Sequence, residues 1–119
     1  KSLTKMSKSQ PDKSIFINDS KELIHKKIKK TTIVSKEIIN NPVMEYAKYI
    51  IFHGNNELLI DRPSKFGGPL SFDSYFMLEK EYRAGNIHPE DLKNSIALKL
   101  NSIVEPIRKH LSDYENLLH

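Results

Sequence analysis

The sequence contains no cysteine, which excludes a disulfide framework and thiolate metal sites and is compatible with a reducing cytosol. No apolar run approaches the length needed to cross a bilayer, and the first residues contain no apolar core of a secretory signal. Neither a Gly-x-Gly-x-x-Gly element nor a Walker A pattern is present. His25, His53, His110 and His119 show no metal-ligand spacing. We therefore expect a cytoplasmic chain with no metal site and no membrane partner.

Basic residues are concentrated in the first third of the chain. Residues 1–36 hold ten lysines and three acidic residues, whereas residues 37–119 hold nine basic and twelve acidic residues. Clustered lysines favour a polyanionic partner, because neutralising phosphates releases condensed counterions. A solvated charged segment would have the same composition, so the charge distribution alone leaves both interpretations open.

The 119 residues are enough for one domain, or for one domain with an arm. After a loop over residues 1–18, we expect a first helix from about residue 20 to residue 30. Asp19 is its predicted N-cap, and Glu22 would complete a capping box. The short apolar run at residues 15–17 is either a strand or a hydrophobic anchor.

Further helices are predicted along the rest of the chain. Asn41 and Pro42 begin one that runs to His53, with Gly54 as a left-handed C-cap. Residues 57–62 and 70–72 are candidate short strands. Asp73 or Ser74 begins the next helix, which Gly85 ends.

The last predicted helix has the strongest pattern in the chain. Its apolar residues follow spacings of four, four, three, four and four: Leu92, Ile96, Leu100, Ile103, Ile107 and Leu111. Pro89 lies in its first turn, and Pro106 is expected to kink it. The predicted fold is mainly α, a small helical bundle with an N-terminal loop and minor short strands.

A Lys/Ser-rich loop precedes the first helix. Lys5 and Lys8 flank small hydroxyl residues in a stretch without apolar periodicity, and Pro11 follows closely. Lysine ammoniums and serine hydroxyls are suited to binding phosphate. A solvated tail is the alternative interpretation of the same residues.

The pentapeptide Lys5-Met6-Ser7-Lys8-Ser9 resembles the signature loop of class I aminoacyl-tRNA synthetases. An ordered series of motifs downstream resembles the C-terminal part of tyrosyl-tRNA synthetases of the archaeal and eukaryotic type. The resemblance covers essentially all of the chain. The motifs are Asn41-Pro42-Val43-Met44-Glu45-Tyr46, Arg62-Pro63, Lys65-Phe66-Gly67-Gly68, His88-Pro89-Glu90-Asp91 and Glu105-Pro106-Ile107-Arg108.

The resemblance implies that residues 1–18 form a catalytic loop segment and that residues 19–119 form an α-helical anticodon-binding domain. The loop would close over ATP, which Mg²⁺ accompanies as part of the substrate. Lys8 would stabilise the leaving pyrophosphate electrostatically, and Lys5 would assist it. The residues of this ATP-binding loop would be Lys5, Met6, Ser7, Lys8 and Ser9.

The resemblance also implies an anticodon site made of Phe66, His88 and Asp91, which would bind a guanine as the first anticodon base. Stacking on flat side chains and hydrogen bonds to base edges are the usual means of recognising unpaired RNA bases. From the residues alone, other roles are open. Phe66 could be a core aromatic, His88 a helix cap, and Asp91 a partner of the helix dipole.

The chain lacks the His-Ile-Gly-His-type motif and the alternating strands and helices of a Rossmann domain. We therefore expect a C-terminal part of a tyrosine–tRNA ligase that is inactive by itself, because the tyrosine pocket is absent. Its partners would be tRNA(Tyr), with ATP and tyrosine bound through the missing domain, and the parent would be a homodimer. The alternatives are a free-standing RNA-binding or regulatory module and the second chain of a split synthetase.

Overall fold

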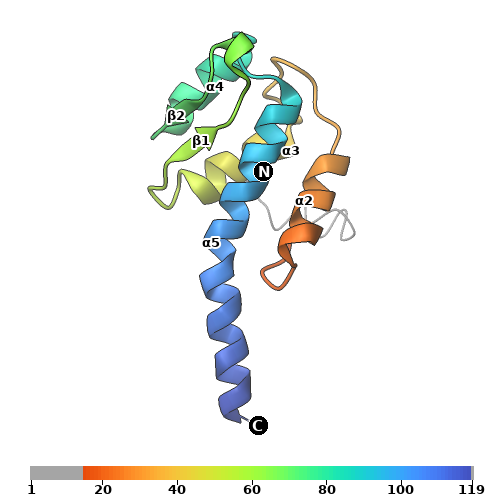
Figure 1. The fold of residues 1–119 in the computed structure, drawn as a ribbon, viewed down its shortest axis with the longest axis vertical. Helices are drawn as coiled ribbons and strands as arrows, with labels where there is room; N and C mark the ends of the chain where they lie inside the picture. Colours follow the sequence, from red (N-terminus) through yellow and green to blue (C-terminus); the bar gives the residue numbers. More distant parts are fainter. Residues whose placement is uncertain (1–14, 119) are drawn as a thin grey trace.

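The computed structural model describes residues 15–118, so the predicted loop at residues 5–9 lies outside the described part. The described elements form a mainly helical fold with one small antiparallel sheet, as the sequence predicts (Figure 1). In chain order they are α2 (Lys21–Lys30), α3 (Pro42–Tyr46), the π-helix η1 (Ala47–Ile51), β1 (Leu58–Ile60), the 3₁₀ helix η2 (Ser64–Phe66), β2 (Leu70–Phe72), α4 (Tyr75–Arg83) and α5 (Pro89–Leu118).

The first half of α5 lies at the centre of the core. Leu92, Ile96 and Leu100 are fully buried, and α2, α3, η1 and β1 pack against this helix. Further along the same apolar seam, Ile107 and Leu111 are exposed, because α5 extends away from the other described elements (Figure 1). Of the helices in residues 15–118, none is both long and apolar enough to cross a membrane.

Pro106, which is expected to kink the last helix, lies inside it, and the kink stays a prediction. α5 continues as one helix from Pro89 to Leu118 with Pro106 inside it. Proline removes the hydrogen bond to the carbonyl of Ser102, and both residues are exposed. Water can therefore solvate that carbonyl, which lowers the cost of the interruption.

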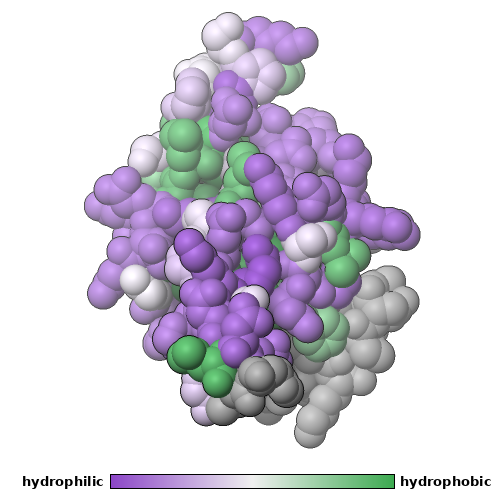
Figure 2. Space-filling model, turned by 60° about the horizontal axis from the view of Figure 1, so that its bottom comes forward, coloured by the Kyte–Doolittle hydropathy of each residue, from purple (hydrophilic) through white to green (hydrophobic). Residues whose placement is uncertain are grey.

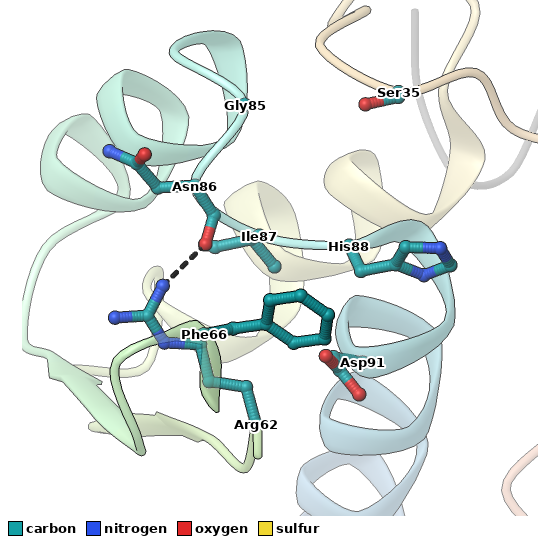
Figure 3. A pocket seen from close by; sticks show the side chains of 8 residues that line it. All are labelled: Ser35, Arg62, Phe66, Gly85, Asn86, Ile87, His88 and Asp91. Carbon is teal, nitrogen blue, oxygen red and sulfur yellow. Dashed lines mark hydrogen bonds between the residues drawn. The ribbon is translucent and has the colours of Figure 1, made fainter. Parts of the chain in front are cut away.

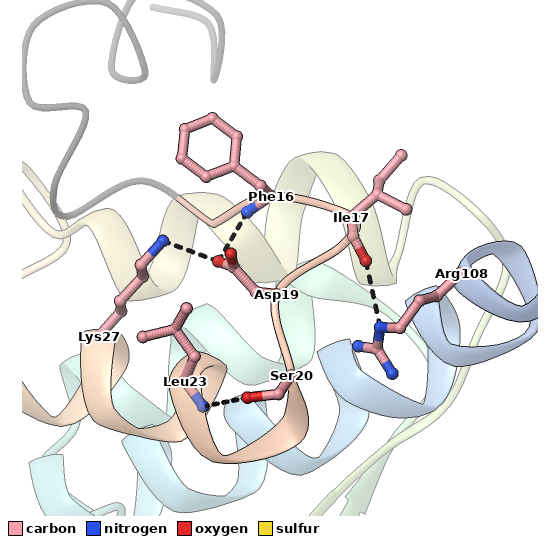
Figure 4. Close-up of polar contacts among 7 residues, drawn as sticks. All are labelled: Phe16, Ile17, Asp19, Ser20, Leu23, Lys27 and Arg108. Carbon is pink, nitrogen blue, oxygen red and sulfur yellow. Dashed lines mark hydrogen bonds and ion pairs between the residues drawn. The ribbon is translucent and has the colours of Figure 1, made fainter. Parts of the chain in front are cut away.

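The first helix begins one residue later than predicted, with Ser20 as its N-cap. The Ser20 side chain accepts a hydrogen bond from the Leu23 amide at 3.1 Å. Asp19 is not the cap, because its carboxylate accepts from the Phe16 amide at 3.0 Å and pairs with Lys27 at 2.7 Å (Figure 4). A tertiary contact therefore overrides the local capping preference of Asp19.

The second predicted helix is confirmed at its start and wrong at its end. Asn41 caps it and Pro42 occupies its first turn. The helix widens into η1, where the Phe52 amide donates to the Ala47 carbonyl at 2.9 Å. Asn55, with φ 60°, takes the left-handed conformation predicted for Gly54. The wider turn shifts the end of the helix, and asparagine tolerates this conformation better than most residues.

The remaining elements occur where the sequence predicts them, with one difference in length. The first strand is shorter than predicted, and it pairs with the second so that Leu59 lies opposite Ser71. Of the two candidate N-caps for α4, Ser74 is the residue whose side chain accepts a hydrogen bond from the Met77 amide. Gly85 follows α4 with φ 87°, as expected for a glycine that ends a helix.

Asn41→Ala should lower the free energy of unfolding by about 1–2 kcal/mol, as expected for loss of an N-cap. The side chain is 1% exposed, accepts from the Met44 amide at 3.0 Å and donates to the Glu37 carbonyl at 3.0 Å. Urea denaturation measures the change. Asn94→Ala, at an exposed position on α5, is the matched control and should change the stability by less than about 0.5 kcal/mol. Equal effects of the two variants would show that the Asn41 cap contributes little.

Candidate functional site

A pocket of ≈ 320 Å³ lies between the turn after β1 and the first turn of α5 (Figure 3). We call it the Phe66 pocket. Three segments that are distant in the sequence form its walls: the loop at Ser35, the turn that carries Phe66, and the stretch from the α4–α5 connection into the first turn of α5. The lining residues are Ser35, Arg62, Phe66, Gly85, Asn86, Ile87, His88 and Asp91. Phe66, His88 and Asp91, the three residues singled out from the sequence, therefore lie around one pocket.

Phe66 is not a core aromatic. Its side chain is 57% exposed at the end of η2, and its ring faces the interior of the pocket (Figure 3). Gly67 and Gly68 follow with φ 109° and φ 80°, so the chain turns sharply away behind the ring. The Lys65 ammonium lies 5.2 Å from the ring centroid. The exposed ring can therefore stack on a flat ligand.

Arg62 joins two walls of the pocket. Its guanidinium donates to the Gly68 carbonyl through Nε and to the Asn86 carbonyl through Nη1 at 2.6 Å (Figure 3). A Cβ at Gly67 would lie 2.5 Å from Arg62 Nη2, and the backbone there has φ 109°, so both the guanidinium and the backbone conformation favour glycine. Arg62 belongs to the Arg62-Pro63 motif of the series that carries the resemblance, but its two carbonyl partners are not apparent from the sequence.

His88 caps α5 and also lines the pocket. Its Nδ1 accepts from the Glu90 amide at 3.1 Å, and its carbonyl accepts from the Leu92 amide at 3.0 Å. The helix-cap interpretation is thus confirmed. Because Nδ1 accepts a hydrogen bond, the neutral ring carries its proton on Nε2. The exposed ring at the rim of the pocket remains available for stacking or donation.

Asp91 presents a carboxylate to the pocket from the first turn of α5 (Figure 3). The residue is partly buried, and within residues 15–118 no hydrogen bond or ion pair engages its side chain. The positive end of the helix dipole favours a negative charge at this position. Two acceptor oxygens therefore face the pocket, and no neighbouring side chain within residues 15–118 satisfies them.

The lysines of α2 differ in their roles. Lys21, Lys26, Lys29 and Lys30 are exposed, as expected for a face that meets solvent or a polyanion. Lys27 instead pairs with Asp19, and its ammonium lies 4.7 Å from the Phe16 ring centroid (Figure 4).

The turn that precedes α2 is tied to the body of the fold. Arg108 of α5 donates to the Ile17 carbonyl at 3.3 Å (Figure 4). Residues 15–17 do not form a strand; Ile15 packs against the core, as the hydrophobic-anchor alternative predicts.

Within residues 15–118, no group of three or more His, Asp or Glu side chains could hold a metal ion. Viewed from the C-terminal end of α5, hydrophilic residues cover most of the molecule, and apolar side chains form small separate groups (Figure 2). The Phe66 pocket is therefore the described feature that brings together the residues singled out from the sequence.

Comparison with known proteins identifies the protein family to which the chain belongs. A sequence model of the family "tRNA synthetases class I (W and Y)" matches residues 2–105. The chain therefore belongs to the class I tRNA synthetase family that comprises the tryptophanyl and tyrosyl enzymes.

The individual relatives narrow the assignment to the tyrosyl members. The chain is 46% identical over 105 residues to the tyrosine–tRNA ligase of Aeropyrum pernix and 48% identical over 107 residues to that of Saccharolobus solfataricus, covering 87% and 90% of this chain. It spans 29% of the length of each of these relatives.

A solved structure shares the fold. The tyrosyl-tRNA synthetase from Pyrococcus horikoshii, crystallised with L-tyrosine, matches with a TM-score of 0.83 and 38% identity over 95% of this chain and 31% of that one. The chain is homologous to tyrosyl-tRNA synthetases.

Proposed function

We propose that the chain is the C-terminal part of a tyrosyl-tRNA synthetase of the archaeal and eukaryotic type. In this proposal, residues 19–119 bind the anticodon and the Phe66 pocket takes its first base, a guanine. The observation that carries the proposal is the convergence of Phe66 with His88 and Asp91, because η2 and the start of α5 bring these residues to one pocket.

The chemistry of the pocket suits an unpaired guanine. The exposed Phe66 ring and the His88 ring at the rim offer flat faces for stacking. The Asp91 carboxylate offers two acceptors to the N1–H and N2–H₂ donors of guanine. Cytosine presents only one donor group on its pairing edge, so an unpaired carboxylate discriminates between the two bases.

The remaining roles follow from the homology to tyrosine–tRNA ligases. The whole enzyme would activate tyrosine with ATP, which Mg²⁺ accompanies, and transfer it to tRNA(Tyr) as a cytoplasmic homodimer. Residues 1–18 would supply the loop that closes over ATP, with Lys5 and Lys8 as its catalytic cations. Residues 5–9 lie outside the described part, so this role rests on the sequence motif.

The 119 residues alone should not form tyrosyl-adenylate, because they contain no Rossmann domain to hold tyrosine. Pyrophosphate exchange with tyrosine and ATP is the assay, and the complete ligase is the positive control. Adding a separately produced catalytic domain tests the split-enzyme alternative, which predicts that exchange returns on mixing. Exchange by the purified chain above background would contradict the prediction.

The anticodon proposal is tested with RNA hairpins that carry guanine or cytosine at the first anticodon position. The complete ligase should bind the guanine hairpin more tightly, measured by fluorescence anisotropy at a fixed salt concentration. Equal affinity for the two hairpins would exclude base recognition by this chain and would favour a module that binds RNA through charge alone.

A further inference from the structure

A second pocket, of ≈ 430 Å³, lies beside the Phe66 pocket, and we call it the Lys36 pocket. It is lined by Lys36, Glu37, Ile38, Ile39, Asn40 and Arg83. The two pockets are formed by neighbouring residues of the same two segments. Ser35 and Gly85 line the Phe66 pocket. Lys36, which follows Ser35, and Arg83, two residues before Gly85, line the Lys36 pocket.

The Lys36 side chain lies at the junction of the two pockets. Its stem passes so close to Gly85 that a Cβ at that glycine would lie 2.7 Å from Lys36 Cε. The ammonium is one bond beyond Cε, and Gly85 belongs to the lining of the Phe66 pocket. A ligand that fills the Phe66 pocket and extends past Gly85 therefore meets the positive charge of Lys36.

The turn that carries Lys36 is held in an unusual conformation. Lys36 has φ 70°, which residues other than glycine rarely adopt. The Glu37 amide donates to the Val34 carbonyl at 3.2 Å, and the Tyr82 hydroxyl donates to the same carbonyl at 2.9 Å. Burial raises the pKa of Tyr82, so its hydroxyl keeps the proton it donates. Backbone strain of this kind is typical of functional sites.

The charges around the Lys36 pocket favour an anion. Within residues 15–118, no hydrogen bond or ion pair engages the Lys36 ammonium. Arg83 is held by Glu79 at 2.9 Å and retains further N–H donors, because one guanidinium has five. Glu37 is the one acidic residue in the lining, so two cations face one carboxylate.

We propose that Lys36, assisted by Arg83, binds the phosphodiester backbone of the single-stranded RNA whose base occupies the Phe66 pocket. This inference rests on the proposed function, because it needs a nucleotide in that pocket. The two pockets then divide the usual tasks of nucleic-acid recognition, since phosphate contacts position the strand and base contacts specify the sequence. Lysine suits the first task as a compact charge on a flexible stem.

Removing the charge should weaken binding without changing base preference. In the complete ligase, Lys36→Gln should lower the affinity for the guanine and cytosine hairpins alike, by about two- to fivefold. The slope of log affinity against log salt should become shallower by about 0.7–0.9. Lys36→Arg should keep both properties near the wild-type values. Lys109→Gln, which removes an exposed lysine from the part of α5 that extends from the body, is the matched control and should have no effect.

Hairpins in which one phosphate is replaced by an uncharged analogue show which phosphate Lys36 contacts. Hairpins with one methylphosphonate on either side of the guanine should lose affinity for the wild-type protein at one of the two positions, and Lys36→Gln should be insensitive to that same substitution. If Lys36→Gln folds poorly, Lys36→Gly removes the charge and accepts the positive φ, so the comparison can still be made.

The outcomes separate the two proposals. If the wild-type protein does not distinguish the two hairpins, the anticodon proposal fails. If it does distinguish them, but Lys36→Gln and Lys36→Gly both behave like Lys109→Gln, then Lys36 does not bind phosphate and the inference is overturned.

Discussion

Lys8→Ala in the complete ligase should lower the rate of tyrosyl-adenylate formation by about 10²–10³-fold, the usual cost of removing one preorganised charge contact from a transition state. Lys8 is the second lysine of the signature pentapeptide, and in the proposed function it would stabilise the leaving pyrophosphate. Negative charge on that group increases as the bond to the α-phosphate breaks. A cation placed there lowers the energy of the transition state more than that of bound tyrosine and ATP.

The measurement separates rate from binding. Pyrophosphate exchange at saturating tyrosine and ATP gives the rate, and equilibrium binding gives the affinity for tyrosine, which should change little. Lys13→Ala removes a lysine from the same basic segment but not from the pentapeptide, and it is the matched control. A similar loss of rate in both variants would show that the general charge of the segment matters rather than Lys8.

The helices and their core could be predicted from the sequence because their signals are local and periodic. The seam from Leu92 to Leu100 is buried as its spacing predicts. The same seam does not show where burial ends, because Ile107 and Leu111 continue the pattern on a part of α5 that extends from the body. Whether a helix face is covered depends on neighbours that are distant in the sequence.

The predicted details were wrong where a distant contact or an unusual turn decides the local structure. Asp19 has the side chain of an N-cap, but Lys27 and the Phe16 amide engage its carboxylate. The π-helix η1 covers five residues, too few for its wider period to appear in the apolar pattern. Asn55 rather than Gly54 therefore takes the left-handed conformation.

The candidate site was found through the ordered motifs rather than through residue chemistry. Phe66, His88 and Asp91 each allowed an ordinary structural role, and His88 does cap α5. Arg62 belongs to one of the ordered motifs but was given no role from the sequence, and Lys36 lies outside those motifs. The partners of Arg62 are backbone carbonyls 6 and 24 residues away, and the role proposed for Lys36 depends on its approach to Gly85.

Asp91→Ala in the complete ligase should lose about 1–3 kcal/mol of discrimination between guanine and cytosine hairpins, or about 5- to 150-fold, by analogy with a bidentate contact between a side chain and a base. The carboxylate faces the Phe66 pocket, and no side chain or backbone group within residues 15–118 satisfies it. Its loss removes both acceptors for the guanine N1–H and N2–H₂ donors. The affinity for the guanine hairpin should fall, while that for the cytosine hairpin should change much less.

Glu90→Ala is the matched control for the helix dipole. Glu90 precedes Asp91 in the first turn of α5, carries the same charge and does not line the pocket. Both variants therefore remove one favourable charge from the positive end of the helix, and each should cost about 0.3–1 kcal/mol of stability. Only Asp91→Ala should change the ratio of the two hairpin affinities.

Asp91→Asn and Lys26→Gln separate the remaining explanations. Asn keeps the shape of the side chain but replaces one acceptor with a donor, which opposes the guanine donors, so its discrimination should be as poor as that of Asp91→Ala. Lys26 is exposed on α2, and Lys26→Gln should weaken the binding of both hairpins equally and flatten the salt dependence. If Asp91→Ala, like Lys26→Gln or Glu90→Ala, leaves the ratio of the two hairpin affinities unchanged, Asp91 does not recognise the base. Its carboxylate then stabilises the start of α5, and the Phe66 pocket does not bind guanine through it.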